Sequence, residues 1–211
     1  MLERLVADLR GQFARLSPSA ESLRRADILL QLGRALVRLE QQSEAWDAAR
    51  AAFDLYMAEL AWEGAVQACD ILFLADQPDS LPALGNGIWL AVTYPVDPEL
   101  SVALLQRVVE ETPPESDGAA VAAITAFYLV DLRAGEPQRE HLLIYVNQLL
   151  ATVARRHSGV DGQQAFDKWI VDMELNDPER FLPRLRNIVD VLVQDDWWFD
   201  RDALQAALPT T

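Results

Sequence analysis

Cysteine, histidine and lysine are scarce in this chain of 211 residues, which holds one Cys, two His and one Lys. The single cysteine, Cys69, rules out a disulfide within the chain and is typical of a reducing compartment. Because Cys69 lies in an apolar run, we expect it to be a buried small side chain. The histidines, His141 and His157, are too far apart for a zinc-binding pattern, so we expect no metal and no cofactor.

Sequence motifs of common enzyme classes are also missing. The chain has no glycine-rich phosphate loop, no dinucleotide-binding glycine pattern after a strand, no Gly-x-Ser-x-Gly elbow and no Glu-x-x-His pair. Missing motifs do not exclude an enzyme, but they favour a binding or assembly role. We therefore expect no catalytic activity.

Long apolar runs are absent as well. The longest, residues 118–130, is shorter than the roughly 20 residues of a membrane-spanning helix and lies between Asp117 and Asp131. Residues 1–10 are amphipathic and charged, unlike a signal peptide. Apolar residues nevertheless make up 51% of the chain, which is enough to bury a core. The sequence thus predicts a cytoplasmic protein that does not enter a membrane.

Basic charge is limited, since 18 basic residues face 33 acidic ones and the formal net charge is −15. This balance opposes binding to nucleic-acid backbones and anionic membranes. The acids are unevenly placed: residues 1–50 hold 8 Arg and 7 acids, whereas residues 51–150 hold 3 Arg and 15 acids. The acidic part is either a solvated surface that keeps the protein soluble or a surface that attracts a basic protein partner.

Helical periodicity, by contrast, runs through almost the whole sequence. Apolar residues recur at helical spacing in about ten segments, and no segment alternates as a strand would. The turns are a few residues long, so successive helices should pack as antiparallel neighbours. We expect one all-α domain over residues 1–211, with a soft division near residues 112–117, where prolines and acids cluster.

Several local signals mark where helices begin or cross. Asp97-Pro98-Glu99 and Asp177-Pro178-Glu179 each combine an N-cap acid with proline in the first turn. The break at Ser17-Pro18-Ser19 is expected to start the second helix, and Ser43 to cap the third. In the apolar stretch 81–94, two glycines at positions 85 and 87 indicate either a close helix crossing or a break.

Residues 28–53 form the clearest pattern, an amphipathic helical hairpin. Its apolar positions are Ile28, Leu29, Leu32, Leu36 and Leu39 in the first helix and Ala45, Ala48, Ala49, Ala52 and Phe53 in the second. With a Leu32-Gly33 pair and small residues where the helices meet, the hairpin resembles a tetratricopeptide repeat. The resemblance covers about one repeat, and it implies an array of antiparallel hairpins. An irregular helical bundle is the alternative.

The resemblance also implies a binding surface. It places Arg34 and Arg38, one turn apart on the first helix of the hairpin, in a groove that binds other proteins. The two-carboxylate clamp of chaperone-binding family members is not reproduced, because Leu30 and Arg34 stand at its usual Lys and Asn positions. Its peptide specificity is therefore not expected.

Trp197 and Trp198 form a second candidate surface. Adjacent aromatic residues point in different directions, so we expect at least one of them to pack on the preceding helix. The pair is either a lid on the core or an anchor for a partner, because Trp and Arg dominate the binding energy of many interfaces.

These observations lead to a non-catalytic protein-protein interaction module that acts as an adaptor, chaperone or assembly factor. One alternative is a helical enzyme or small-ligand binder with a site between helices around Trp89 and Tyr94. Another is an acidic mimic of nucleic acid that occupies a DNA-binding protein.

Overall fold

Eleven helices and no strand make up the part of the chain that the computed structural model describes, residues 1–17 and 21–208. The expected all-α fold is confirmed. The helices are α1 (Leu2–Arg15), α2 (Ser22–Val37), α3 (Gln42–Ala58), α4 (Trp62–Leu74), α5 (Ser80–Thr93), α6 (Pro98–Glu111), α7 (Asp117–Arg133), α8 (Gln138–Ser158), α9 (Gln163–Asp172), α10 (Pro178–Val193) and α11 (Arg201–Ala206). Pro18 and Ser19, expected to start the second helix, lie outside the described residues. Ser17 does not cap that helix, which begins at Ser22 with Glu21 as its N-cap.

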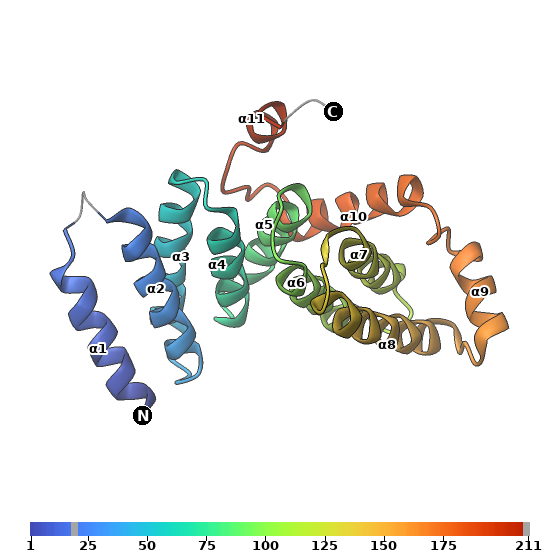
Figure 1. Ribbon diagram of the computed structural model, residues 1–211, viewed down its shortest axis with the longest axis horizontal. Helices are drawn as coiled ribbons and strands as arrows, with labels where there is room; N and C mark the ends of the chain where they lie inside the picture. Colours follow the sequence, from blue (N-terminus) through green and yellow to red (C-terminus); the bar gives the residue numbers. More distant parts are fainter. Residues whose placement is uncertain (18–20, 209–211) are drawn as a thin grey trace.

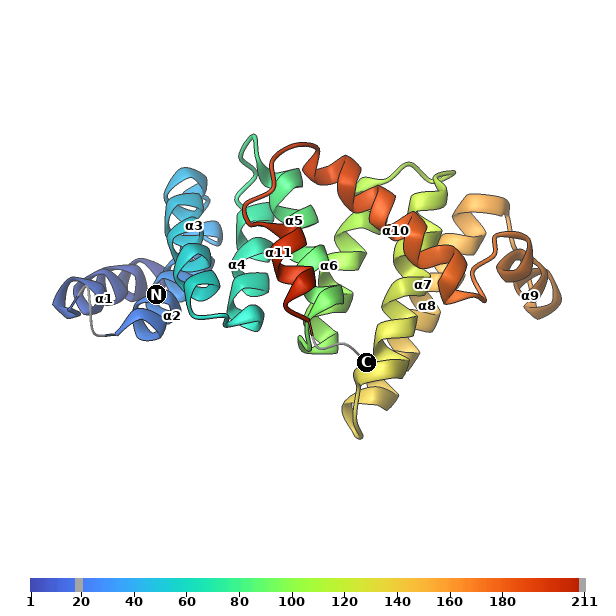
Figure 2. The same ribbon diagram turned by 90° about the horizontal axis from the view of Figure 1, so that it is seen from above.

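The first nine helices form an array in which each packs against the next along the long axis of the molecule (Figure 1). Helix α10 departs from this order, because it runs back along the array and makes its main contacts with α5 and α7. The chain then crosses to α11, which lies over the middle of the array (Figures 1 and 2). Helix α10 and the residues after it therefore return to helices that precede them in the chain.

The helix N-caps expected at Asp97 and Asp177 are confirmed, and the one expected at Ser43 is wrong. The carboxylates of Asp97 and Asp177 accept hydrogen bonds from the backbone N–H of Glu99 (2.8 Å) and Glu179 (2.9 Å). Ser43 does not cap α3, which begins at Gln42 without a side-chain cap. The reason lies in the turn: Glu40 adopts a left-handed φ of 58°, so the chain reverses within residues 38–41 and α3 starts one residue before Ser43.

Helix α5 is continuous, so its glycines mark close crossings rather than a break. A Cβ atom on Gly85 would lie 2.5 Å from Val193 of α10, and one on Gly87 would lie 2.7 Å from Cys69 of α4. Only glycine allows the helices to approach so closely. Cys69 is fully buried, as expected, and burial raises the pKa of its thiol.

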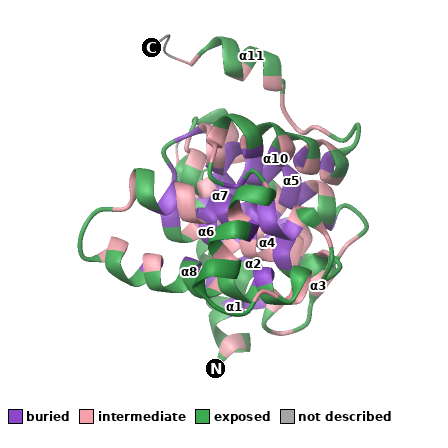
Figure 3. Cartoon of the chain, turned by 90° about the vertical axis from the view of Figure 1, so that its right-hand side faces the viewer, coloured by how far each residue is buried: buried purple, intermediate pink, exposed green. Residues whose placement is uncertain are grey.

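Small side chains also set the contact between α2, α3 and α4. Ala45, Ala49 and Ala52 are completely buried, and a Cβ on Gly33 would lie 3.2 Å from Ile71 of α4. The residues that carry the family resemblance thus lie where these three helices touch. Buried residues gather along the interior of the array, and exposed ones cover its outer helix faces (Figure 3). In the described residues no helix is both long enough and apolar enough to cross a membrane.

Candidate functional site

A row of polar side chains joins four helices that alternate along the array, α2, α4, α6 and α8. We call this row the even-helix face and define it by Arg34, Gln67, Asp70, Gln106, Arg107 and Tyr145. Arg34 of α2 donates a hydrogen bond to the Gln67 side chain of α4 at 2.7 Å. The next contacts link Asp70 of α4 to α6 and the Tyr145 hydroxyl of α8 to Gln106 of α6.

Asp70 is the electrostatic centre of the even-helix face. Burial raises the pKa of its carboxyl, against the opposing effect of the Arg107 and Arg34 guanidinium groups. Its Oδ1 lies 3.7 Å from Nε of Arg107, too far for a hydrogen bond, and both atoms are buried without a hydrogen-bond partner. The two charged groups are therefore paired without a hydrogen bond between these atoms. A buried carboxylate oxygen and a buried guanidinium nitrogen stay unpaired in the middle of this face.

Arg34, one of the two predicted arginines, lies at the α2 end of this face. Arg34 in α2 and Arg38 at its C-cap are both exposed. Arg34 is oriented by Gln67, which fixes its guanidinium group over α4. Arg38 follows one turn later, at the end of the helix.

The other end of the face opens into a hollow of about 430 Å³ between α6 and α8. Its lining residues are Glu99, Val102, Ala103, Gln106, Gln138, His141, Leu142 and Tyr145. Two residues of the even-helix face, Gln106 and Tyr145, belong to this lining. The face therefore continues from exposed arginines at α2 to a hollow with mixed polar and apolar walls at α8.

The aromatic pair lies elsewhere, against helices α3 and α5. Trp198 contacts Phe53 of α3 edge-on, with ring centroids 5.3 Å apart, and Trp197 contacts Trp89 of α5 at 6.3 Å. The chain leaves α10 at Gln194, whose φ of 53° and ψ of −119° turn it away from that helix. Both tryptophans are half-buried.

The position suggested for a small ligand is occupied by side chains. Trp89 is buried and contacts Trp197 and Phe199, and Tyr94 stacks on Trp62 with centroids 3.9 Å apart. These rings fill the space beside α5 in the structure. A ligand here would have to displace the C-terminal aromatic side chains.

Asn86 is the residue that sequence reasoning missed. It is completely buried in α5, where its Nδ2 donates to the carbonyl oxygens of Pro82 (2.9 Å) and Asp196 (3.3 Å). Its Oδ1 accepts a hydrogen bond from the backbone N–H of Trp198 at 3.2 Å. The signal was a lone amide within the apolar run of residues 81–94.

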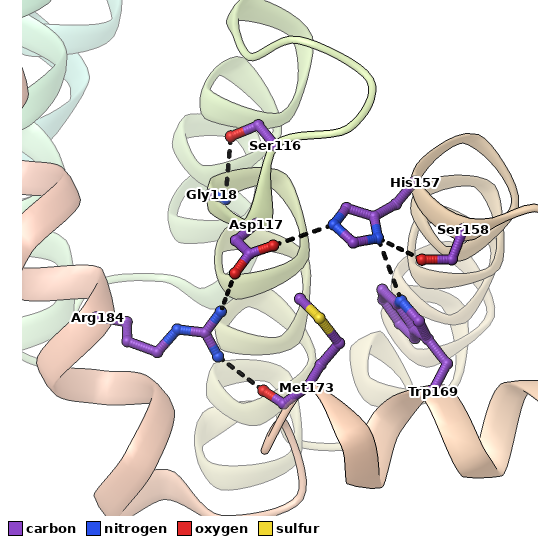
Figure 4. Close-up of polar contacts among 8 residues, drawn as sticks. All are labelled: Ser116, Asp117, Gly118, His157, Ser158, Trp169, Met173 and Arg184. Carbon is purple, nitrogen blue, oxygen red and sulfur yellow. Dashed lines mark hydrogen bonds and ion pairs between the residues drawn. The ribbon is translucent and has the colours of Figure 1, made fainter.

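A second polar cluster surrounds Asp117 at the far end of the array (Figure 4). The Asp117 carboxylate contacts Nε2 of His157 at 3.1 Å and the guanidinium of Arg184 at 3.2 Å. Nδ1 of His157 lies 2.6 Å from the Ser158 hydroxyl, and Arg184 also donates to the Met173 carbonyl at 2.7 Å.

The order of Asp117, His157 and Ser158 is that of an acid-base relay, but the surroundings favour a structural tether. The Asp117 side chain is 66% exposed and shared with Arg184, whereas a relay carboxylate is buried and serves its histidine alone. Through Arg184 the contacts connect α7, α8 and α10. His157 thus joins this tether from the last turn of α8.

No protein-family model, curated protein sequence or solved structure matches the chain. The geometry of the chain itself therefore defines its candidate surfaces. Two of them stand out: the even-helix face, and the contact between the C-terminal aromatic residues and helices α3 and α5.

Proposed function

We propose that this protein is a non-catalytic protein-binding module that works as an adaptor, chaperone or assembly factor, with a tetratricopeptide-like hairpin at α2 and α3. The observation that supports it most is the even-helix face, which joins side chains from four separate helices into one surface. An array whose alternate helices share a face offers an extended surface for a partner. Arg34 and Arg38 are the proposed anchors on it, because Arg side chains often dominate interface energies.

The charge distribution supports a protein partner over a nucleic acid. A net charge of −15 repels phosphate backbones, and 15 acids against 3 Arg in residues 51–150 attract a basic protein surface. The acids would then increase the rate of encounter, while the arginines on α2 would hold the complex together.

The proposal is tested by co-purification of the tagged full-length protein from extracts of the cells that produce it, followed by mass spectrometry. We expect one or a few proteins with a basic surface to be retained by the wild type and lost from the Arg34→Ala/Arg38→Ala variant. An Arg24→Ala variant is the matched control, because Arg24 is also exposed on α2 and, among the described residues, forms only an ion pair with Glu21, at 3.6 Å. Equal recovery by all three proteins would contradict the proposal.

A thermal-shift screen with common metabolites tests the alternative that the protein is an enzyme or a small-ligand binder. A ligand stabilises a protein only by binding its native state, so a protein-binding module should show no large shift. Strong stabilisation by one metabolite would favour a small-ligand binder or an enzyme instead.

A further inference from the structure

We call residues 195–208 the C-terminal segment. They follow α10 in the chain, but residues 196–199 lie against helices α3 and α5. The side chains that receive the segment are Trp46, Arg50 and Phe53 from α3 and Asn86 and Trp89 from α5. We call this set the α3–α5 groove. From its contacts we infer that the groove is a peptide-binding site, and that the C-terminal segment is its intramolecular occupant.

The main chain of the segment is held by one side chain. Asn86 donates to the carbonyl oxygen of Asp196 at 3.3 Å and accepts from the N–H of Trp198 at 3.2 Å. An amide side chain has both a donor and an acceptor, so Asn86 can pair with a carbonyl and an N–H two residues apart. This contact is made to the main chain and does not depend on the side chains of the segment.

Neighbouring side chains of the segment go to opposite helices. Trp197 and Phe199 both contact Trp89 of α5, with centroids at 6.3 and 5.2 Å, whereas Trp198 contacts Phe53 of α3. Such alternation is how a groove selects side chains along an extended peptide.

Arg50 adds a preference for an electron-rich ring. Its guanidinium carbon lies 4.2 Å from the centroid of the Trp198 ring, a cation-π contact. The segment is also acidic, with Asp195, Asp196, Asp200 and Asp202 against a single basic residue, Arg201. The ligand class that matches this segment is therefore a peptide with consecutive aromatic residues beside aspartates, and the aromatic rings and the main chain make the contacts.

The burial of Asn86 is a reason to regard the groove as a site rather than as ordinary packing. Without the segment, its Oδ1 and one N–H would lose their partners in an apolar helix. An apolar residue at this position would avoid that penalty. The buried amide is explained by a main chain that binds beside it.

Two further features indicate that the C-terminal segment can leave the α3–α5 groove. Gln194, at its base, has backbone angles that glycine adopts easily and other residues adopt under strain. Beyond the aromatic residues, α11 lies on the outside of the array (Figures 1 and 3); none of its residues is buried, and Leu204 is only partly buried against the core. A partner that carries a similar acidic aromatic peptide would therefore bind by displacing the segment. This inference is independent of the even-helix face.

The experiment measures binding of a fluorescent peptide with the sequence of residues 194–208 to two full-length proteins, the wild type and a variant in which Trp197, Trp198 and Phe199 are alanine. We expect the variant to bind at least about tenfold more tightly, because in the wild type the tethered segment competes at an effective concentration in the millimolar range. A peptide with Trp198→Ala is the control and should bind weakly to both. Equal binding to both proteins, or no binding to a folded variant, would overturn the inference.

A second measurement tests the same inference in a protein that keeps Trp197, Trp198 and Phe199. Gln205→Cys places a spin label on α11, and Cys69 stays unlabelled because it is fully buried. Millimolar peptide should then narrow the spectrum of the label as the segment is released, and the Trp198→Ala peptide should not. An unchanged spectrum would overturn the inference.

A wild-type dimer that the peptide converts to monomers would show that the groove holds the segment of a second copy, and would overturn the intramolecular assignment.

Discussion

Asn86 is the residue on which the docking of the C-terminal segment depends most. Its side chain makes three hydrogen bonds at a position with no solvent exposure, two of them to a chain segment more than one hundred residues away. Hydrogen bonds of this kind stabilise little while both partners are present, but losing one partner leaves the other buried and unpaired.

We therefore expect Asn86→Ala to lower the free energy of unfolding by about 1 to 3 kcal/mol. Urea denaturation of the full-length protein measures it. Asn147→Ala is the matched control, because Asn147 is exposed on α8 and, in the part of the chain that the structure describes, its side chain bonds only to a carbonyl within its own helix. The control should change stability by no more than about 0.5 kcal/mol. Equal effects of the two substitutions would contradict the assigned role of Asn86.

Asp70 gives a prediction about pH. Burial raises the pKa of its carboxyl, so the folded protein disfavours the ionised form more than the unfolded chain does. Above the folded-state pKa, the ionised group therefore destabilises the fold, and below the unfolded-state pKa this destabilisation is absent. We expect Asp70→Asn to unfold at a higher temperature than the wild type at neutral pH, with a difference that shrinks as the pH falls through the raised pKa. Calorimetry from pH 4 to 7.5 tests this, and an Asp70→Asn protein that is less stable at neutral pH would show that the Arg107 ion pair outweighs burial.

At the scale of helices, the glycines of α5 decide how closely its neighbours approach. A methyl group on Gly85 would lie 2.5 Å from Val193 and 3.0 Å from Leu192, so α10 would have to move. We expect Gly85→Ala to destabilise the protein by about 1 to 3 kcal/mol, as in other overpacked cores.

Gly11 provides the matched control for that substitution. It lies in the interior of α1, and a Cβ there would meet nothing within 4 Å. Gly11→Ala should therefore stabilise by roughly 0.5 to 1 kcal/mol, the usual gain of alanine over glycine inside a helix. Thermal denaturation of the two variants should give melting temperatures on opposite sides of the wild type. A Gly85→Ala protein as stable as Gly11→Ala would contradict the close crossing of α5 and α10.

Local signals predicted the helices well. Asp97 and Asp177 begin helices as their capping pattern indicates, and the alanine-rich run of α7 is buried between neighbouring helices. These features depend on residues within one or two turns of each other, which a sequence displays directly. The start of α3 was missed because Glu40, not glycine, adopts the left-handed conformation that ends α2.

Long-range packing could not be predicted in the same way. Nothing in the spacing of apolar residues indicates that α10 returns to α5 and α7, or that Trp197 and Trp198 reach α5 and α3. Such contacts depend on which surfaces remain uncovered after the local helices have packed. Of the candidate sites, the exposure of Arg34 and Arg38 was predicted, whereas Asn86 and the α3–α5 groove became visible only in three dimensions.

For the molecule as a whole, the net charge of −15 leads to a prediction about binding kinetics. Attraction between the acidic surface and a basic partner should speed association, and salt screens it beyond about 8 Å at 0.15 M. We expect the association rate constant to fall severalfold between about 0.05 and 0.5 M salt, with a much smaller change in the dissociation rate. Surface plasmon resonance with the co-purified partner measures both. An association rate that does not respond to salt would show that the acids serve only solubility.

If the even-helix face binds a protein through Arg34 and Arg38, the Arg34→Ala/Arg38→Ala variant should have a lower affinity for the co-purified partner. Titration calorimetry should give a dissociation constant at least about tenfold higher than that of the wild type, a loss of about 1.4 kcal/mol or more. The melting temperature should stay close to that of the wild type, because both side chains are exposed. A double variant that is equally stable and binds the partner as tightly as the wild type would contradict the claim.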